Sequence, residues 1–422
     1  MSNSVKTAMS EQHTKTVSVL KFGGTSVKNI ARIQHVADII KARLKDGPLI
    51  VVVSAMGDTT DYLVKLANQC TAQPNKREMD LLLSTGEQIS IALLAIVLQS
   101  MGIKAKSFTG YQVGIFTESV FSKARIVDLK TETLNTALED HDVLVVAGFQ
   151  GMTESGDVTT LGRGGSDTTA VALAGAMNAV VCDIFTDVDG VYTADPNTIH
   201  SAKLLKTIRY EEVLEMARLG AQVIHPRAVE LARQYGVRLR VRNTFKPDHE
   251  GTLIHGGEEV EIYRTVSGVA IDKEQVRCSI MDVPDVPGIA GKIMRALADK
   301  NIVIDMIMQA VHPSVGLNNV TFTVNESELD ETIKVLESLK GKLGTGEVMF
   351  DKDIAKVSLI GAAMVGQPGI AATLFEALGG AGINIKMIAT SEMKLTCVVG
   401  RSDAAKAANL IHDAFELDKV TA

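Results

Sequence analysis

The chain has 422 residues, which is enough for two or three domains with apolar cores of their own. Its formal net charge of −7, without any block of clustered Lys and Arg, excludes a nucleic-acid-binding protein of the usual basic kind. The 4 cysteines lie far apart, with neither a CxxC pair nor His at zinc-ligand spacing, so we expect reduced thiols.

Residues 1–16 are polar and lack the apolar segment of a signal peptide, so we expect a flexible N-terminal extension. No uninterrupted apolar run reaches about 18 residues, and a membrane span is therefore not expected. Together with the composition, these features predict a soluble, cytoplasmic protein without a membrane or nucleic-acid partner.

Strands and helices alternate in the first half of the chain. The apolar patterns predict strands over residues 17–22, 49–53, 143–149 and 180–186, and helices over residues 30–44, 81–98 and 168–177. Repeated units of this kind predict an α/β fold, a mostly parallel sheet sandwiched by helices. In such sheets ligands bind beyond the carboxyl ends of the strands.

A glycine-rich loop over residues 159–170 is the most informative local feature. Its glycines let backbone N–H groups approach an anion, and the helix that follows directs its partially positive N-terminus to the same place. Ser166, Asp167 and Thr168 are also good N-cap residues, so the loop is equally typical of a capped helix start. The loop alone does not decide between an anion site and a cap.

Complementary polar residues at other predicted strand ends favour a shared ligand site. Lys21 precedes a Gly-Gly turn, Ser54 ends the second strand, Glu87 lies in an otherwise apolar helix, and Arg163 offers a bidentate guanidinium. Taken singly, Glu87 could be a solvated helix residue and Lys21 a charge at a strand edge. The sequence has no P-loop, GxGxxG, GxSxG or HExxH motif. Cations and glycine turns without an evident base suit phosphoryl transfer to a carboxylate, which is already ionised at neutral pH.

Six motifs resemble those of the aspartokinase family, and the resemblance extends from about residue 16 to the end of the chain. They lie at residues 21–26, 54–61, 85–87, 148–151, 162–167 and 186–192. The resemblance implies an ATP:L-aspartate 4-phosphotransferase, an enzyme with a carboxyl group as acceptor. Its product would be 4-phospho-L-aspartate, at the head of lysine, threonine and methionine biosynthesis.

The resemblance also implies a role for each matching residue. Lys21 would stabilise the transferring phosphoryl group, Glu87 would pair with the α-ammonium of aspartate, and Arg163 would bind its α-carboxylate. The implied catalytic residues are Lys21, Arg163 and Asp167, and the implied aspartate-binding residues are Ser54, Thr60, Glu87, Phe149, Arg163 and Ser166. The implied ATP-binding residues are Lys21, Gly23, Gly24, Thr186, Asp187, Tyr192, Asp195, Asn197 and Gln222. Mg²⁺ would arrive bound to ATP, because the sequence has no dedicated metal cage.

Two positions depart from the family pattern on the nucleotide side. Many relatives have Arg where this chain has Asn197, and Lys where it has Gln222. Each change removes a cation expected near ATP, for which Lys203 or Arg227 could compensate.

The second half contains an internal duplication. The segment Pro287-Gly288-Ile289-Ala290 recurs 81 residues later, and residues 287–307 match the second copy at 10 of 21 positions without gaps. Each copy reads β-α-β-β-α, the order of a small ferredoxin-like α+β module. The copies resemble paired ACT domains. We therefore predict an extension over residues 1–16, a kinase domain over residues 17–263, and ACT-like modules over residues 264–345 and 346–422.

Each module leaves a sheet edge that pairing with another copy would cover. By resemblance, such pairing between two chains forms effector sites for lysine, threonine or both, and makes the protein a dimer, a tetramer or a complex with a short regulatory form. The implied effector residues are Asp285, Gln309, Asn384, Ile385, Ser391 and Glu392. Three alternatives remain open: modules that only dimerise, an amino-acid-sensing scaffold with weak or lost kinase activity, and another kinase of the same superfamily.

Overall fold

The computed structural model describes residues 17–220, 223–257, 265–312, 316–362, 364 and 367–420. The predicted extension over residues 1–16, the predicted boundary at residues 263 and 264, and Gln222 lie outside the described residues. Contacts divide the chain into two compact units. The first unit contains residues 1–191, 206–213 and 223–258, and the second contains residues 192–205, 214–222 and 259–422.

A mostly parallel sheet forms the centre of the first unit. Its eight described strands run in the order β10-β12-β11-β9-β1-β2-β6-β3. The bounds are β1 Ser18–Phe22, β2 Leu49–Val53, β3 Ala105–Phe108, β6 Val143–Ala147, β9 Cys182–Thr186, β10 Thr207–Arg209, β11 Leu239–Asn243 and β12 Thr252–His255. Only β11 and β12 pair in antiparallel fashion. Strands β2 and β6 are buried at every position, as expected for strands covered on both faces.

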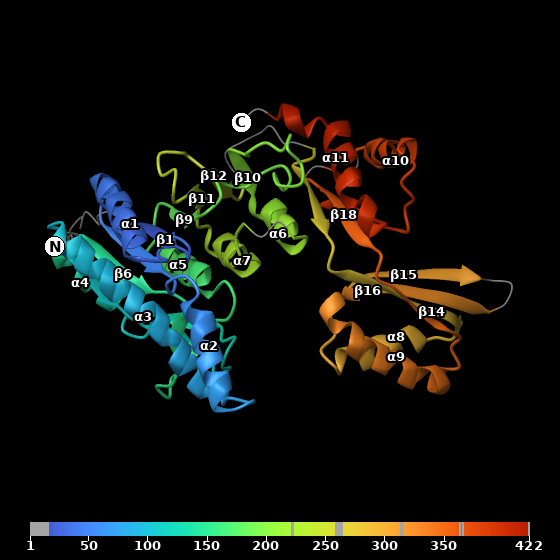
Figure 1. Cartoon of the computed structure of the whole chain (residues 1–422), viewed down its shortest axis with the longest axis horizontal. Helices are drawn as coiled ribbons and strands as arrows, with labels where there is room; N and C mark the ends of the chain where they lie inside the picture. The colour runs from blue at the N-terminus through green and yellow to red at the C-terminus, as the bar shows by residue number, and fades with distance from the viewer. Residues whose placement is uncertain are drawn as a thin grey trace, which may run out of the picture. The chain divides into compact units, whose positions relative to one another are not determined.

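Helices cover the sheet as the sequence predicted. Helices α1 (Ile30–Arg43) and α3 (Lys76–Ser100) share one apolar core with β1, β2 and β6. Helix α5 (Gly165–Ala176) packs against β1 and against α7 (Pro226–Tyr235), and Figure 1 shows these elements around the sheet. The remaining described helices of this unit are α2 (Thr59–Cys70) and α4 (Glu132–Asp140), with part of α6 (Tyr210–Arg218).

Among the described residues, only α3 is long and apolar enough to cross a membrane. Ile91, Leu94 and Leu98 of this helix are buried in the core of the first unit, together with strands of the sheet. The helix therefore has a packing role that explains its composition.

The start of α5 differs from the sequence prediction. The helix begins at Gly165 and its N-cap is Gly164, which has a left-handed φ of 71° and makes no side-chain capping bond. Ser166, Asp167 and Thr168 therefore lie in the first helical turn and are not caps. The capping alternative and the predicted helix start at residue 168 are wrong, because a glycine can adopt the left-handed conformation without steric cost and take the N-cap position itself.

A second, small sheet lies beside the predicted ligand loop. It contains β4 (Ile115–Thr117), β5 (Ile126–Leu129), β7 (Gln150–Met152) and β8 (Val158–Thr160), in the order β5-β4-β7-β8. Strands β7 and β8 form an antiparallel pair, and the chain runs from β8 through residues 161–164 into α5.

The second unit contains both predicted ferredoxin-like modules. One sheet has the order β15-β16-β14-β17 and carries α8 (Ile289–Ala298) and α9 (Leu329–Leu343) on one face, as Figure 1 shows. The other has the order β13-β18-β20-β19 and packs against α10 (Ile370–Gly380) and α11 (Ala404–Ala414). The remaining bounds are β13 Gly268–Asp272, β14 Gln275–Pro284, β15 Ile304–His312, β16 Leu317–Asn325, β17 Val348–Asp351, β18 Ala355–Ile360, β19 Met387–Thr390 and β20 Lys394–Val399.

Each module has one flanking strand that the predicted division placed in the other module. Strand β13 comes before the first module in the chain but pairs with β18 of the second module. Strand β17 comes after the predicted end of the first module but pairs with β14 of that module. The first module is thus inserted between two strands of the second. The predicted division at residues 345 and 346 instead assigned β13 to the first module and β17 to the second.

The segment from Tyr192 to Leu205 belongs to the second unit. Thr193 is fully buried there, and its hydroxyl forms a 2.9 Å hydrogen bond with the ring of His412 in α11. The carbonyl of Thr193 accepts a hydrogen bond from Val269 in β13. This segment is therefore fixed to the second ferredoxin-like module.

Candidate active site

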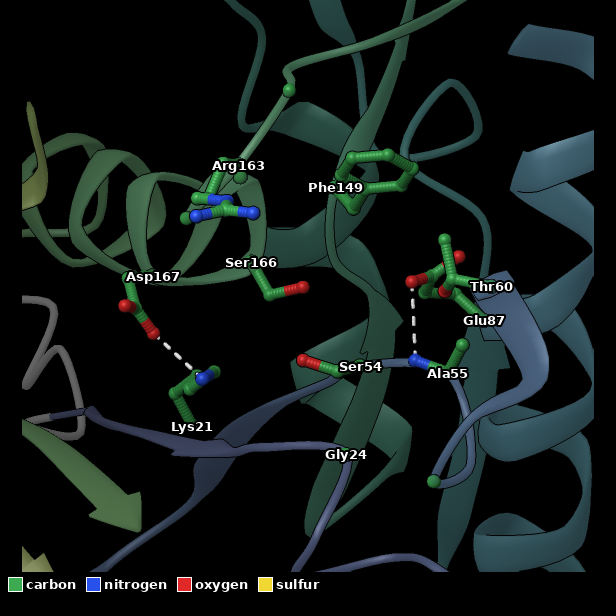
Figure 2. A pocket seen from close by; sticks show the side chains of 14 residues that line it. Lys21, Gly24, Ser54, Ala55, Thr60, Glu87, Phe149, Arg163, Ser166 and Asp167 are labelled. Carbon is green, nitrogen blue, oxygen red and sulfur yellow. Dashed lines mark hydrogen bonds and ion pairs between the residues drawn. The ribbon is translucent and has the colours of Figure 1, made fainter. Parts of the chain in front are cut away.

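A cavity of about 300 Å³ opens at the carboxyl ends of β1 and β2 and the N-terminus of α5. Figure 2 shows Lys21 and Asp167 on one side, Glu87 and Thr60 on the opposite side, and Ser54 and Ser166 between them. The described lining residues are Lys21, Gly24, Ser54, Ala55, Gly57, Thr60, Glu87, Phe149, Gly162, Arg163, Gly164, Gly165, Ser166 and Asp167. All residues predicted to be catalytic or to bind aspartate thus line one cavity.

Lys21 and Asp167 form an ion pair at this cavity, with 2.6 Å between Nζ and Oδ1. Lys21 lies near the end of β1, and Asp167 lies in the first turn of α5. The two side chains are only 12% and 13% exposed, so the pair is mostly desolvated. Asp167 therefore holds the ammonium group of Lys21 in one place while leaving the lysine at the cavity wall.

Glu87 presents a buried carboxylate from α3. Its Oε1 accepts a 3.0 Å hydrogen bond from the backbone N–H of Ala55, and its Oε2 has no hydrogen-bond partner among the described residues. Burial raises the pKa of Glu87 to about 7, against a partial opposing effect of the Ala55 hydrogen bond. A buried, half-satisfied carboxylate is a site that favours binding of a cation such as an ammonium group.

Arg163 lies in the loop between β8 and α5, flanked by Gly162 and Gly164 with φ of 76° and 71°. Its side chain lines the cavity, and Figure 2 shows the guanidinium on the same side as Asp167 and Ser166. No ion pair of Arg163 occurs in the part of the chain that the structure describes. A guanidinium in this position can bind a carboxylate by two parallel hydrogen bonds.

The turn after β1 makes a close backbone contact with the turn after β2. The N–H of Gly57 donates to the carbonyl of Gly24, and a Cβ added at Gly24 would lie 2.9 Å from the carbonyl oxygen of Ala55. Only glycine fits at residue 24 without displacing that backbone. The two turns form a narrow floor of the cavity, suited to the oxygens of an anion.

Phe149 adds a strained backbone to the cavity wall. Its φ is 70°, its N–H donates to the hydroxyl of Thr169, and its carbonyl accepts from Leu161. These bonds to α5 and to the loop keep Phe149 in an unfavourable conformation, a pattern often found at functional sites.

The predicted ATP-binding residues are distributed over both units. Gly23 and Gly24 follow β1, and Thr186 ends β9, where the side chain of Asn243 contacts the carbonyl of Asp187. In the second unit, Asn197 donates its backbone and side-chain N–H groups to the carboxylate of Asp195 at 3.0 Å. Tyr192 also belongs to the second unit.

The sequence left Arg227 open as a substitute for the cations missing at residues 197 and 222. In the structure its guanidinium instead binds backbone carbonyls near Arg163. Its guanidinium donates to the carbonyls of Leu161 and Ala124, at 2.8 and 2.9 Å. Burial lowers the pKa of Arg227, since desolvation disfavours the charged form. One terminal nitrogen is thus engaged with the loop that carries Arg163, and the other with the separate segment that contains Ala124.

The site residues assigned individually from the sequence omit five that line the cavity, although three of these five are glycines of the loop over residues 159–170. The five are Ala55, Gly57, Gly162, Gly164 and Gly165. All five lie within the motifs. The backbone N–H of Ala55 donates to the buried carboxylate of Glu87, and this contact links two of the motifs. Among the described residues, no group of three or more His, Cys, Asp or Glu could hold a metal ion.

The predicted effector residues lie in the second unit, on both modules. Asp285 follows β14 and accepts a 3.0 Å hydrogen bond from Asn318, and Gln309 lies exposed on the edge strand β15. The others, in the second module, are Asn384, Ile385, Ser391 and Glu392.

Known proteins match almost the whole chain. The Amino acid kinase family matches residues 16–243, and the ACT domain matches residues 277–341 and again residues 357–415. An aspartokinase of Bacillus sp. (strain MGA3) is 47% identical over 94% of this chain and 97% of its own length. The chain belongs to the aspartokinase family. Its predicted family, its fold class and its enzyme class, an aspartate kinase, are therefore confirmed.

Solved aspartokinase structures have the same fold. Escherichia coli aspartokinase III in complex with aspartate and ADP, in the R-state, has a TM-score of 0.78 and 26% identity, over 94% of this chain and 99% of that one. The same enzyme in complex with lysine and aspartate, in the T-state, has a TM-score of 0.75 and 25% identity, over 94% and 99%. The aspartokinase match and the intact cavity residues favour an active kinase over a scaffold.

Proposed function

We propose that this aspartokinase transfers the γ-phosphoryl group of ATP to the β-carboxylate of L-aspartate, giving 4-phospho-L-aspartate for lysine, threonine and methionine biosynthesis. The observation that carries the proposal is the single cavity with Lys21, Glu87 and Arg163 on its walls. An amino acid with one ammonium and two carboxylate groups complements one carboxylate and two cations. The aspartate and ADP bound by Escherichia coli aspartokinase III support the same pair of substrates.

Aspartate would bind by its α-substituents, which do not react. Glu87 pairs with the α-ammonium, which supplies a partner to its unpaired Oε2, and Arg163 binds the α-carboxylate. Thr60, Phe149 and Ser166 complete the wall around the substrate. The β-carboxylate is then directed toward Ser54 and Lys21.

The reaction needs no general base, because the β-carboxylate is already ionised. One of its oxygens attacks the γ-phosphorus, a new O–P bond forms, and the bond between the phosphorus and the bridging oxygen of ADP breaks. Lys21 neutralises charge on the transferring group, and Asp167 keeps its ammonium in place. The backbone N–H of Gly24 would bind a phosphate oxygen, and the N–H of Gly23 would do so in place of its 3.4 Å contact with the carbonyl of Phe185.

The other nucleotide contacts are assigned to Thr186, Asp187, Tyr192, Asp195, Asn197 and Gln222. Mg²⁺ would enter with ATP and reduce the repulsion between the phosphates and the aspartate carboxylate. Asn197 and Gln222 carry no charge, so we expect weaker nucleotide binding than in relatives with Arg and Lys there.

The raised pKa of Glu87 gives a testable pH dependence. The free enzyme binds aspartate with the ionised carboxylate, so kcat/KM for aspartate should fall below a pH of about 7. In Glu87→Gln this limb should disappear and KM should rise about 100-fold, since a charged hydrogen bond is lost. A pH profile of kcat/KM measures both effects, and an unchanged acidic limb in the variant would assign it to another group.

Stability provides an independent measurement of the same group. Because burial raises the folded-state pKa of Glu87, its contribution to folding is most favourable below the unfolded value of about 4.5 and is lost as pH rises through about 7. Without substrate, the change in the free energy of unfolding caused by Glu87→Gln should therefore be more favourable at pH 8 than at pH 5. The difference between the two pH values should be about 2 to 3 kcal/mol. Urea unfolding at the two pH values tests this sign.

For regulation we propose feedback inhibition by lysine, threonine or both, with effectors bound where modules of two chains pair. Asp285 and Gln309 of one module would then face Asn384, Ile385, Ser391 and Glu392 of another. The lysine complex of Escherichia coli aspartokinase III supports an amino-acid effector. The open edge of β15, in the order β15-β16-β14-β17, supports a homo-oligomer, either a dimer or a tetramer, or a complex with a short regulatory form.

An effector titration tests regulation without affecting the catalytic assignment. Lysine and threonine, added separately and together, should lower the rate of aspartyl phosphate formation at subsaturating aspartate. Asp285→Ala should raise the inhibitory concentration at least tenfold with kcat unchanged, because a charged contact to the effector is lost. As a control, Asp330→Ala, on an exposed turn of α9, should retain normal inhibition. A constant rate under all conditions would leave the modules with a dimerising role only.

A further inference from the structure

The glycines beside Arg163 favour a flexible loop, but contacts in the fold hold this loop tightly. Arg163 has a glycine on each side, and both glycines adopt left-handed φ values. A Gly-Arg-Gly segment has a large backbone entropy when free, so a guanidinium on it has no defined direction by itself. Recognition of a carboxylate by two parallel hydrogen bonds requires that direction to be fixed.

Asp80 holds one side of this loop from α3. Its carboxylate is fully buried and accepts from the N–H of Ser122, and from both the N–H and the hydroxyl of Thr160, each at 2.8 to 3.0 Å. No cation pairs with Asp80 among the described residues, so backbone and hydroxyl donors compensate its charge. Thr160 is the last residue of β8, three positions before Arg163.

Arg227 holds the other side from α7. Its two terminal nitrogens bind the carbonyls of Leu161 and Ala124, which lie on the two segments that Asp80 also joins. The N–H of Ala124 donates to the carbonyl of Thr160 at 2.9 Å, so the two segments are also bonded to each other. An anion on one side and a cation on the other thus fix both segments.

The glycines then pack against these fixed groups. A Cβ at Gly162 would lie 3.1 Å from the carbonyl oxygen of Ser122, and one at Gly164 would lie 2.1 Å from the ring of His225, the N-cap of α7. Ser122 itself has a φ of 72°, an unfavourable value that its hydrogen bond to Asp80 stabilises. The loop therefore has little room to change its course.

Helix α3 connects this support to the opposite wall of the cavity. Asp80 and Glu87 are seven residues apart, which is almost two helical turns, so both lie on the same face, roughly 10 Å apart along the axis. One rigid helix thus sets the position of Glu87 directly and that of Arg163 through Thr160. The spacing between the two proposed contacts to aspartate is fixed by the same element.

We propose that Asp80 and Arg227 are positioning residues that fix the guanidinium of Arg163 for the α-carboxylate of aspartate. The inference rests on the proposed function, in which Arg163 binds that carboxylate. Neither residue lines the cavity, and both act through the backbone of residues 160–164.

The experiment compares steady-state kinetics of the full-length enzyme with matched controls. Asp80→Asn retains the shape but places an amide group against an N–H donor, and Arg227→Lys cannot reach both carbonyls. Each should raise KM for aspartate about 10-fold or more, with KM for ATP within twofold. Two substitutions of exposed residues serve as controls. They are Glu78→Gln on α3 and Arg233→Lys on α7. Both should leave all constants within twofold.

A double-mutant cycle separates positioning from a general effect on folding. In an Arg163→Ala background, Asp80→Asn should raise KM for aspartate by less than twofold, because its effect acts through the missing side chain. If Asp80→Asn raises KM for aspartate by the same factor with and without the Arg163 side chain, the proposal is overturned. It is also overturned if either single variant has a lower melting temperature but an unchanged KM for aspartate. If Asp80→Asn does not fold, Arg227→Lys decides by the same cycle. An unchanged KM in Arg163→Ala alone would instead reject the proposed function.

Discussion

Lys21→Ala should lower kcat about a thousandfold, with a small change in KM for aspartate. Lys21 is the cation at the end of β1, held by Asp167 at 2.6 Å, and we assign it to the charge of the transferring phosphoryl group. Loss of a preorganised charge that acts mainly in the transition state costs about 10² to 10³ in kcat, and arginine fingers in related chemistry cost more. Steady-state kinetics with saturating ATP and aspartate measure the effect.

The variant also leaves Asp167 without its cation, so stability must be separated from chemistry. The carboxylate is 13% exposed, and an unpaired carboxylate there should destabilise the fold. The double variant Lys21→Ala, Asp167→Asn should recover the melting temperature but not the turnover. The control Lys419→Ala breaks an exposed pair with Glu416 at 2.7 Å and should change neither. Near-normal turnover of Lys21→Ala would mean that another cation stabilises the phosphoryl group.

The sequence predicted strands β1, β2, β6 and β9 and helices α1, α3 and α5 of the first unit because their patterns are strong. Strand β2 is a run of five buried apolar residues, and α3 is a long apolar helix, so neither depended on tertiary information. The cavity followed from topology, since Lys21 and Ser54 come at the carboxyl ends of adjacent parallel strands. The aspartokinase motifs supplied the roles that this geometry alone does not give.

Long-range pairing explains most of what the sequence did not predict. Strands β13 and β17 lie outside the duplicated β-α-β-β-α pattern, and no local signal tells which of two similar sheets each strand joins. The role of Asp80 was missed because a single acid in a helix is normally solvated, and its partners Ser122 and Thr160 are 42 and 80 residues away. A useful signal was its spacing of seven from Glu87 on one helix face.

Arg163→Ala should damage aspartate binding more than turnover. Two charge-assisted hydrogen bonds to the α-carboxylate are lost, which corresponds to about 3 kcal/mol and an increase in KM of roughly 100-fold. Arg163→Lys keeps the charge but cannot form parallel bonds, so an intermediate KM is expected. Kinetics at varied aspartate and saturating ATP measure both variants.

A truncated ligand tests which group of aspartate Arg163 contacts. β-Alanine has the ammonium and the reacting carboxylate of aspartate but no α-carboxylate. As a competitive inhibitor against aspartate, it should bind the wild-type enzyme and Arg163→Ala with constants within about twofold of each other, since the contact that Arg163 makes is absent in both. In Glu87→Gln its binding should weaken, because the ammonium partner is lost. Weaker binding of β-alanine to Arg163→Ala would assign the arginine to the reacting carboxylate, which would make it a catalytic residue on the same side of the cavity as Lys21.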